Sequence, residues 1–304
     1  MMNCPQCNIN KHIIKSGIRQ TQEGIIQKYY CKHCKKYFTN KTQAYTHYPL
    51  HVILYTLQQY NKGYPVTKAK TRTGKKYRYS PPERTIYSWI TRYQHTLTFL
   101  KLRKQYMIDP HHLITTHRFN HQQIYPFTYH NLKLNLYSKQ FPQLKRYINW
   151  VKRSLPTTIF LSGPRASQCT ACKKIKTKQK KSIAPELTRL ALHLQAKNQS
   201  VHEAVEQFFL YNDSTTICTE LPVFLNPKET DKFNIETPLT GHIDIIQIRN
   251  KKVYIMDYKP NLNHPECYSG QLMAYKQALH HRTQISEDTI ISAVFNQHHY
   301  YEFE

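Results

Sequence analysis

Acidic residues are scarce in this 304-residue chain: 18 are Asp or Glu, against 44 Lys and Arg, and only six of the 18 are Asp. The shortage is uneven. Residues 1–181 contain 34 basic and three acidic residues, whereas residues 182–304 contain 10 basic and 15 acidic ones. A strongly basic segment suits a polyanion, of which nucleic acid is the commonest. We therefore expect the two halves of the chain to have different partners.

Long hydrophobic runs are also missing, because no stretch approaches the roughly 20 apolar residues of a membrane-spanning helix. The chain opens with a pair of cysteines rather than with a signal peptide. We therefore expect a soluble, cytoplasmic protein with no membrane partner. The length allows two or three domains, and 39% hydrophobic residues are enough to build buried cores.

Six of the eight cysteines form three C-x-x-C pairs, which in a cytosolic protein indicates metal ligation rather than disulfides. Cys4, Cys7, Cys31 and Cys34 have the spacing of a zinc ribbon, in which two knuckles close a tetrahedral Cys4 site. We predict a structural Zn²⁺ with no open coordination position for chemistry.

The third pair is harder to interpret. Cys169 and Cys172 would form a second zinc or iron–sulfur site only if Cys218 and Cys267 joined them. The alternative is that single cysteines are buried small residues, as they usually are. The sequence leaves this second site open.

The N-terminal segment as a whole resembles the zinc ribbon that opens many insertion-sequence transposases. An apolar-periodic helix over 48–60 follows, then a break at 61–63, and then a helix over 80–93 with Ser80 as its N-cap and Pro81 at its first position. The polar segment 67–79 between them gives no clear helical pattern. This order predicts a helix-turn-helix domain whose last helix reads DNA.

The polar face of that last helix supplies the candidate base contacts, and the basic segment before it supplies the candidate phosphate contacts. The alternative is an amphipathic helix with an ordinary solvated face. The candidate DNA-binding residues are Arg84, Ser88, Arg92, Lys75, Lys76 and Arg78.

Two apolar segments near the C-terminus, 240–248 and 252–259, read as adjacent buried strands joined by a tight turn. Asp244 lies in the first, and Asp257 and Lys259 share one face of the second. An isolated carboxylate in an apolar strand is costly unless it is paired or binds a cation. A shared divalent metal ion explains both carboxylates.

Three motifs follow one another in this region: G-x-x-D at 241–244, D-x-K at 257–259 and Q-x-x-x-Y at 271–275. With the predicted order of helices and strands from residue 182 onward, they resemble the PD-(D/E)XK nuclease superfamily, RecB-like branch. The resemblance implies an α/β core with a central mixed sheet flanked by helices. Two departures are Asp257, where Glu is commoner, and Ile243, where Pro is commoner.

The chemistry expected of these residues is metal-dependent phosphodiester hydrolysis. Asp244, Asp257 and the Tyr258 carbonyl offer hard oxygen ligands to Mg²⁺ or Mn²⁺. Lys259 would position the attacking water and stabilise developing charge, and a neighbouring cation would favour its neutral form as a base. The resemblance further implies that Gln271 and Tyr275 line the site, and that His202 and Glu220 are additional metal ligands.

The sequence thus predicts a multidomain metal-dependent nuclease, with endonuclease favoured, acting on DNA with RNA as an alternative. The alternatives in function are a transposase- or recombinase-associated protein, and a DNA-binding regulator with an inactive nuclease domain. We expect such a protein to belong to a mobile element, a virus or a defence system. The expected boundaries are a zinc ribbon at 1–40, a helix-turn-helix domain at 41–105, a basic, aromatic-rich connecting region at 106–181 and the nuclease domain at 182–304.

Overall fold

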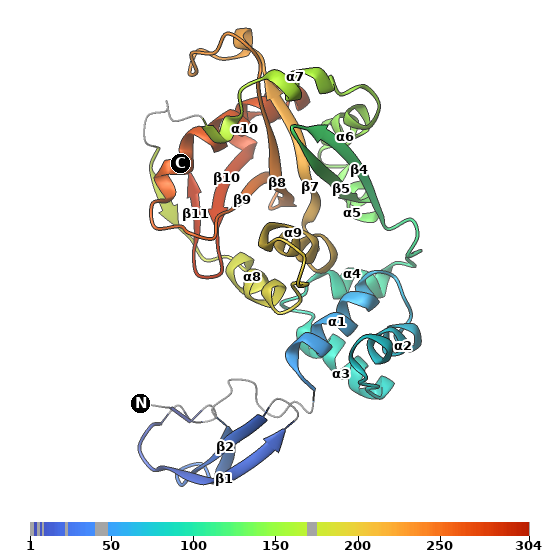
Figure 1. The fold of residues 1–304 in the computed structure, drawn as a ribbon, viewed down its shortest axis with the longest axis vertical. Coiled ribbons are helices and arrows are strands. Elements are labelled where there is room, and N and C mark those ends of the chain that lie inside the picture. The colour runs from blue at the N-terminus through green and yellow to red at the C-terminus, as the bar shows by residue number, and fades with distance from the viewer. Residues whose placement is uncertain are drawn as a thin grey trace. The chain divides into compact units, whose positions relative to one another are not determined.

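The computed structural model describes residues 3–4, 7, 9–21, 24–39, 48–168 and 175–303. The chain divides into two compact units (Figure 1), which we call the N-terminal unit, Met1–Pro49, and the main unit, Leu50–Glu304. Within the described ranges, no helix is both long and apolar enough to cross a membrane.

The N-terminal unit is a small three-stranded antiparallel sheet in the order β1-β2-β3. Its strands are β1 (Ile13–Thr21), β2 (Gly24–Cys31) and β3 (Lys36–Thr39). Among the described residues of this unit, the buried cluster consists of Cys4, Cys31 and Phe38. So few buried side chains cannot stabilise a sheet of this size by themselves, so it needs a further cross-link such as a bound metal ion.

The main unit begins with four helices: α1 (Leu50–Asn61), α2 (Val66–Tyr77), α3 (Glu83–Tyr93) and α4 (Phe99–Gln105). The first three contact one another. Each buries a short apolar stripe, for example Leu54 in α1, Ala69 in α2 and Trp89 in α3. The polar segment after residue 66 is therefore a helix, because Val66, Ala69 and Thr73 recur at helical spacing.

An eight-stranded mixed sheet forms the centre of the main unit, in the order β4-β5-β7-β8-β9-β10-β11-β6. Only β9 and β10 are parallel; the other neighbours are antiparallel. The strands are β4 (Ile114–His121), β5 (Gln123–His130), β6 (Thr177–Gln179), β7 (Thr216–Leu225), β8 (Leu239–Arg249), β9 (Lys252–Tyr258), β10 (Ile290–Phe295) and β11 (Tyr300–Phe303).

The described residues of this unit form six further helices, some on the sheet and some at its edges (Figure 1). They are α5 (Asn131–Tyr137), α6 (Pro142–Ser154), α7 (Thr157–Ser162), α8 (Ala184–Leu192), α9 (Val201–Asn212) and α10 (Ser269–Thr283). Because both faces are covered at the centre, β8 and β9 are almost continuously apolar rather than alternating.

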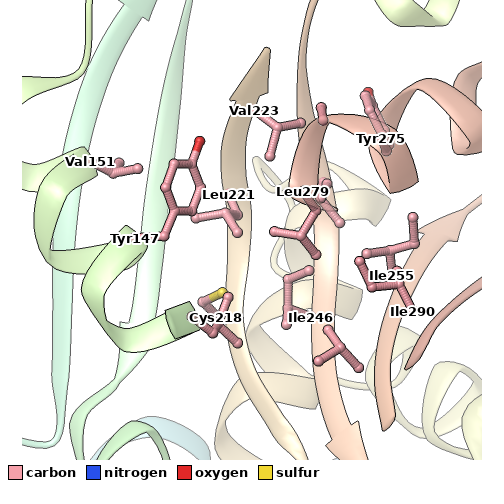
Figure 2. Packing of buried hydrophobic residues seen from close by; sticks show 14 of the residues in the cluster. Tyr147, Val151, Cys218, Leu221, Val223, Ile246, Ile255, Tyr275, Leu279 and Ile290 are labelled. Carbon is pink, nitrogen blue, oxygen red and sulfur yellow. The ribbon is translucent and has the colours of Figure 1, made fainter. Parts of the chain in front are cut away.

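The largest core lies on the sheet face that α6 and α10 cover. Figure 2 shows Tyr147 of α6 and Leu279 of α10 packing against Leu221 of β7 and Ile246 of β8. On the opposite face, Phe209 of α9 packs against Phe295 of β10 with ring centroids 5.3 Å apart. The sheet is therefore held between two helical layers, and α9 is fixed against the face that α10 does not cover.

The C-terminal end of α9 also joins the sheet to the N-terminal helices. Asn61 Nδ2 of α1 donates to Asn212 Oδ1 at 2.9 Å, and Thr98 Oγ1 donates to Asp213 Oδ1 at 3.1 Å. The buried Lys133 donates to the carbonyls of Leu210 and Asp213, each at 2.7 Å. These bonds satisfy polar groups at the buried helix end and fix its position.

Two helix boundaries differ from those that the pattern predicts. The helix expected over 80–93 begins at Glu83 with Pro82 in the N-cap position, so Ser80 and Pro81 lie outside it. The helix expected over 48–60 begins at Leu50 and ends at Asn61.

Candidate active site

Strands β8 and β9 place two aspartates side by side at the centre of the sheet. Ile245 is paired with Met256, so Asp244 and Asp257 occupy neighbouring positions on adjacent strands. Asp257 is buried, whereas Asp244 is half-buried. Asp244 Oδ2 accepts a hydrogen bond from the backbone N–H of Tyr258 at 2.9 Å. This local fold agrees with the strand-turn-strand pattern read from the sequence.

Three carboxylates converge at this point. Glu206 of α9, Glu220 of β7 and Asp244 of β8 each bring an oxygen within 4.8 Å of the other two. Glu206 is buried and one of its oxygens has no hydrogen-bond partner. Glu220 adopts a left-handed backbone conformation, with φ +53°, next to this cluster. Hard oxygen donors grouped this closely are the ligands that Mg²⁺ and Mn²⁺ prefer.

The charges of this cluster are poorly compensated by the protein itself. Burial, and next the charge of Glu220, raises the pKa of Glu206 well above its ordinary value. Burial, followed by the charge of Asp257, raises the pKa of Asp244 well above its ordinary value and that of Glu220 to about 7. Carboxylates that repel one another in this way are stabilised when a cation lies between them, so the donor set fits a divalent metal ion.

Glu206 is the member of the cluster that the sequence interpretation missed. It lies one helical turn after His202 in α9, so the two side chains share a face of the helix. The signal available in the sequence is an acidic residue inside the apolar segment 204–210, on the same helix face as a candidate ligand. The expected ligand Asp257 does not belong to the three-carboxylate cluster but lies beside it.

Asp257 is held by residues of the two later motifs. Lys259 Nζ lies 2.7 Å from Asp257 Oδ2, and Gln271 Nε2 donates to Asp257 Oδ1 at 3.2 Å. Burial alone would lower the pKa of Lys259, but the charges of Asp257 and Asp244 outweigh it and raise that pKa. In the absence of a metal ion the protein's own charges thus favour an ammonium at Lys259, and the neutral lysine expected beside a bound cation stays a prediction.

Tyr275 lies on α10, which covers the face of the sheet opposite to α9, and closes the site from that face. Gln271 Nε2 lies 3.1 Å from Tyr275 Oη, and the Tyr275 ring covers Gly241. A Cβ atom at position 241 would lie 2.3 Å from Tyr275 Cε1, so only glycine allows this approach. Gly241, Gln271 and Tyr275 therefore act together in packing, which explains why the first and third motifs carry these residue types.

His202 lies beside the Tyr258 carbonyl. Its Nε2 is 2.9 Å from that carbonyl oxygen, so the ring N–H donates there. Burial lowers the pKa of His202 and favours the neutral imidazole, the form that binds metal ions. The structure thus brings together two groups that the resemblance implies as ligands, the imidazole and the Tyr258 carbonyl.

A second cluster of metal-ligating side chains lies in the N-terminal unit. The Sγ atoms of Cys4, Cys7, Cys31 and Cys34 all lie within 4.8 Å of one another. The pairs Cys4–Cys34 and Cys7–Cys31 are 3.6 and 3.7 Å apart. A tetrahedral zinc ion with bonds of about 2.3 Å places sulfurs just under 4 Å apart, so the four thiols fit a closed zinc site.

The other cysteines do not show a comparable arrangement. Cys218 is buried in the main core, where Figure 2 shows it on β7 near Tyr147, and burial raises the pKa of its thiol. Cys267 is exposed. In the part of the chain that the structure describes, neither belongs to a group of three or more metal-ligating side chains. Cys169 and Cys172 lie outside the described residues.

The candidate DNA-binding residues are exposed. Arg84, Ser88 and Arg92 recur every four residues on the solvent side of α3, opposite the buried Ile86, Trp89 and Ile90. Lys75, Lys76 and Arg78 are exposed at the end of α2. Tyr87 on α3 is also 56% exposed.

Comparisons with known proteins give one family. Neither the curated proteins nor the solved structures provide a match. Residues 128–299, more than half of the chain, match the PD-(D/E)XK nuclease superfamily. The matched region begins in β5, well before the boundary expected at residue 182, and includes α9, the carboxylate-bearing strands and α10. The chain belongs to the PD-(D/E)XK nuclease superfamily.

Proposed function

We propose that this protein is a nuclease that hydrolyses phosphodiester bonds of DNA with Mg²⁺ or Mn²⁺. Members of the superfamily are typically metal-dependent nucleases acting on nucleic acid. The observation that carries the proposal is the cluster of Glu206, Glu220 and Asp244 beside the Asp257–Lys259 ion pair. It supplies oxygen ligands and a cation on adjacent elements of one sheet.

The metal-holding residues we propose are Asp244, Asp257, Glu220, Glu206, His202 and the backbone carbonyl of Tyr258. A divalent ion held there supplies a polarised water and offsets the charge of the phosphate. Asp244 and Glu220 are half-buried, whereas Glu206 and Asp257 are buried, so we propose that a substrate meets the cluster from the side of Asp244 and Glu220.

Lys259 is proposed to act as an ammonium. While paired with Asp257, its ammonium group would donate a hydrogen bond to the attacking water or to a phosphate oxygen and so position that group. Gln271 holds the second oxygen of Asp257 and orients that carboxylate. Tyr275 supports Gln271 and closes the site over Gly241.

Within the superfamily we place the chain in the RecB-like branch. The order of G-x-x-D, D-x-K and Q-x-x-x-Y on β8, β9 and α10 supports this assignment, as does His202 on the helix that precedes β7. The domain organisation we propose keeps the expected zinc ribbon and helix-turn-helix domain before the nuclease. The nuclease sheet then includes the β4–β5 hairpin from the region expected to be a connector.

Targeting to DNA is proposed to come from α1–α3 as a helix-turn-helix domain. Three helices in mutual contact, with Arg84, Ser88 and Arg92 exposed on the last, are what such a domain requires. Lys75, Lys76 and Arg78 would contact phosphates. The zinc ribbon and this domain resemble the front end of insertion-sequence transposases, which supports a role in a mobile element, a virus or a defence system.

Cleavage of labelled linear, circular and single-stranded DNA, and of RNA, with Mg²⁺ or Mn²⁺ tests the proposal. Wild type is compared with Asp257→Asn, which keeps the size of the side chain and removes its charge. We expect metal-dependent cleavage that the variant loses, and cutting of closed circles would identify an endonuclease. Tight, salt-sensitive binding without cleavage by either protein would contradict the proposal and favour a regulator.

A further inference from the structure

A short strap of chain outside the three motifs is fixed to the start of β8. The backbone N–H of Thr240 donates to the Pro164 carbonyl at 2.9 Å, and Arg165 pairs with Thr240 in an isolated parallel bridge. A Cβ atom at Gly163 would lie 2.6 Å from the Ile159 carbonyl oxygen. The glycine therefore allows the end of α7 to turn tightly, so that Arg165 reaches the strand that carries Asp244.

The guanidinium of Arg165 is held by Tyr125 at the start of β5. Arg165 Nη2 donates to Tyr125 Oη, and the guanidinium carbon lies 5.3 Å from the centroid of the same ring. Tyr125 in turn stacks on His242 of β8, with centroids 3.8 Å apart and planes at 6°. Arginine fixed by a hydrogen bond and by an aromatic ring loses little further conformational entropy when it binds a ligand.

The ring stack beneath Arg165 is itself fixed. His242 Nε2 and His121 Nδ1 are 2.8 Å apart, and His121 stacks on Phe160 of α7 with centroids 4.0 Å apart. Burial lowers the pKa of His121 to about 4, so its ring is neutral. Arg165 is thus the charged member of this stack.

Arg165 and the carboxylate cluster lie on the same face of the sheet. His242 and Asp244 are alternate residues of β8, so their side chains share a face. Gly241, the residue before His242, points to the opposite face, where it meets Tyr275 of α10. Glu206 reaches Asp244 from α9, and Tyr125 and Arg165 cover His242 from the β5 and α7 side. The charge of Arg165 also partly offsets the raised pKa of Glu220.

Arg165 nevertheless forms no ion pair with a carboxylate among the residues that the structure describes. It is half-buried, and within the described part of the chain one of its five N–H groups has a hydrogen-bond partner, Tyr125. A guanidinium that is oriented, partly desolvated and left with free donors suits a planar or tetrahedral oxyanion. The anion that must approach a carboxylate cluster of this kind during phosphodiester hydrolysis is a substrate phosphate.

We propose that Arg165 binds a backbone phosphate of the nucleic-acid strand at the catalytic site, and that Tyr125 is the residue that positions it. The inference rests on the proposed nuclease function and adds a substrate contact that none of the three motifs contains. The strand would pass between the cluster on the α9 side and the β4–β5 hairpin with α7 on the other. Arg165 also supplies positive charge where the carboxylates would repel a phosphate.

The same chain offers a matched control. Arg249, at the other end of β8, is also half-buried, donates to Tyr300 Oη at 2.6 Å and stacks on Tyr254 with the guanidinium carbon 3.9 Å from the ring centroid. It has the same local chemistry as Arg165 without a place in the carboxylate cluster. Arg165→Gln and Arg249→Gln therefore remove comparable packing, and only the first is expected to remove a substrate contact.

Cleavage rates and DNA binding of wild type, Arg165→Gln and Arg249→Gln are compared at several salt concentrations, with binding measured in an Asp257→Asn background. For Arg165→Gln we expect kcat/KM to fall by about 10²-fold. The slope of log affinity against log salt should shrink by roughly 0.7–0.9, the loss of one phosphate contact. Arg249→Gln should match wild type in both measurements.

Tyr125→Phe separates positioning from folding. It keeps the ring stack on His242 and the charge of Arg165 but removes the acceptor, so we expect a several-fold rise in KM with the salt slope unchanged. The inference would be overturned if wild type cleaves DNA and Arg165→Gln has the same cleavage rate and the same salt dependence of DNA binding as Arg249→Gln. Wild type that binds DNA but never cleaves would defeat the proposed function instead, and the salt slope would still decide whether Arg165 contacts phosphate.

Discussion

The two clusters of metal-ligating side chains in this protein differ in what surrounds them. The four thiols of the N-terminal unit lie in a small sheet whose described buried cluster adds only Phe38 to two of the cysteines. The three carboxylates of the main unit lie on a sheet with helices on both faces and a large apolar core. In the first, a bound metal ion would take the place of a core. In the second, the core holds together carboxylates that repel one another.

This difference predicts opposite energetic effects of metal binding. Thiols at a small sheet fold around their ion, so the ion and the fold are inseparable. Carboxylates that burial holds together are strained before any ion arrives, so the fold is independent of the ion and the ion relieves repulsion. The first arrangement is typical of a structural metal site. The second is typical of a catalytic metal site, whose ion can also interact with a substrate.

The largest effect is expected from Cys31→Ser, which removes one zinc ligand. Structural zinc contributes roughly 10–16 kcal/mol in small zinc modules, so the N-terminal unit should unfold while the main unit keeps its melting temperature. Zinc content and hydrogen exchange in β1–β3 measure this. Cys267→Ser, which changes an exposed cysteine of the main unit, is the control. Retained zinc and retained exchange protection in Cys31→Ser would contradict the account.

The next effect concerns the apolar core of the main unit. Leu279 is fully buried between α10 and the sheet (Figure 2), so Leu279→Ala should lower the free energy of unfolding by about 2–5 kcal/mol. The zinc content should not change. Denaturant unfolding measures the effect, with the fully exposed Met107→Ala as control. Equal stability of the two variants would show that this core does not support the fold as described.

Glu206→Gln is expected to have two smaller effects in opposite directions, one on the stability of the metal-free protein and one on metal affinity. Removing a buried charge should stabilise the metal-free protein, whereas Mn²⁺ affinity should fall by about 10- to 100-fold. Thermal unfolding and calorimetric titration with Mn²⁺ measure the two effects. Glu203→Gln, three residues earlier on the same helix and exposed, should change neither. A Glu206→Gln variant with wild-type Mn²⁺ affinity would remove Glu206 from the ligand set.

The smallest effect is a pH dependence of stabilisation by metal. The pKa of Glu220 is raised by burial, and next by Asp257, to about 7, so this group stabilises the metal-free fold below about pH 4.5 and loses that contribution as pH rises through 7. A metal ion at 100 times its Kd should then raise the melting temperature by roughly 5 to 10 °C at pH 8. The rise should be smaller at pH 6, and Glu220→Gln should flatten the difference. Equal rises at both pH values in wild type would contradict this.

Local patterns explain which features were predictable from the sequence. The cysteine spacing and the rare aspartates in apolar strands are each decided within a few tens of residues, so Cys4 to Cys34 and Asp244, Asp257 and Lys259 are visible without a structure. The order of β7, β8, β9 and α10 follows from the same short-range signals. Their roles in catalysis stay predictions until activity is measured.

Long-range contacts explain the rest. The β4–β5 hairpin joins the sheet through Thr128 opposite Thr219, a pairing across ninety residues that no local pattern encodes. Glu206 joins the cluster because α9 is buried on more than one side, which a helical period alone does not show. Arg165 lies in an irregular strap, and its long-range contacts with Thr240 and Tyr125 place it at the site.

Single-turnover cleavage of a short labelled duplex, titrated with Mn²⁺, tests the central claim most directly. Asp244→Asn is compared with Asp231→Asn, an exposed aspartate between β7 and β8. We expect Mn²⁺-dependent cleavage by wild type and by Asp231→Asn, and a loss of at least about 10²-fold in Asp244→Asn. Cleavage that needs no metal, or that survives in Asp244→Asn at the wild-type rate, would contradict the account.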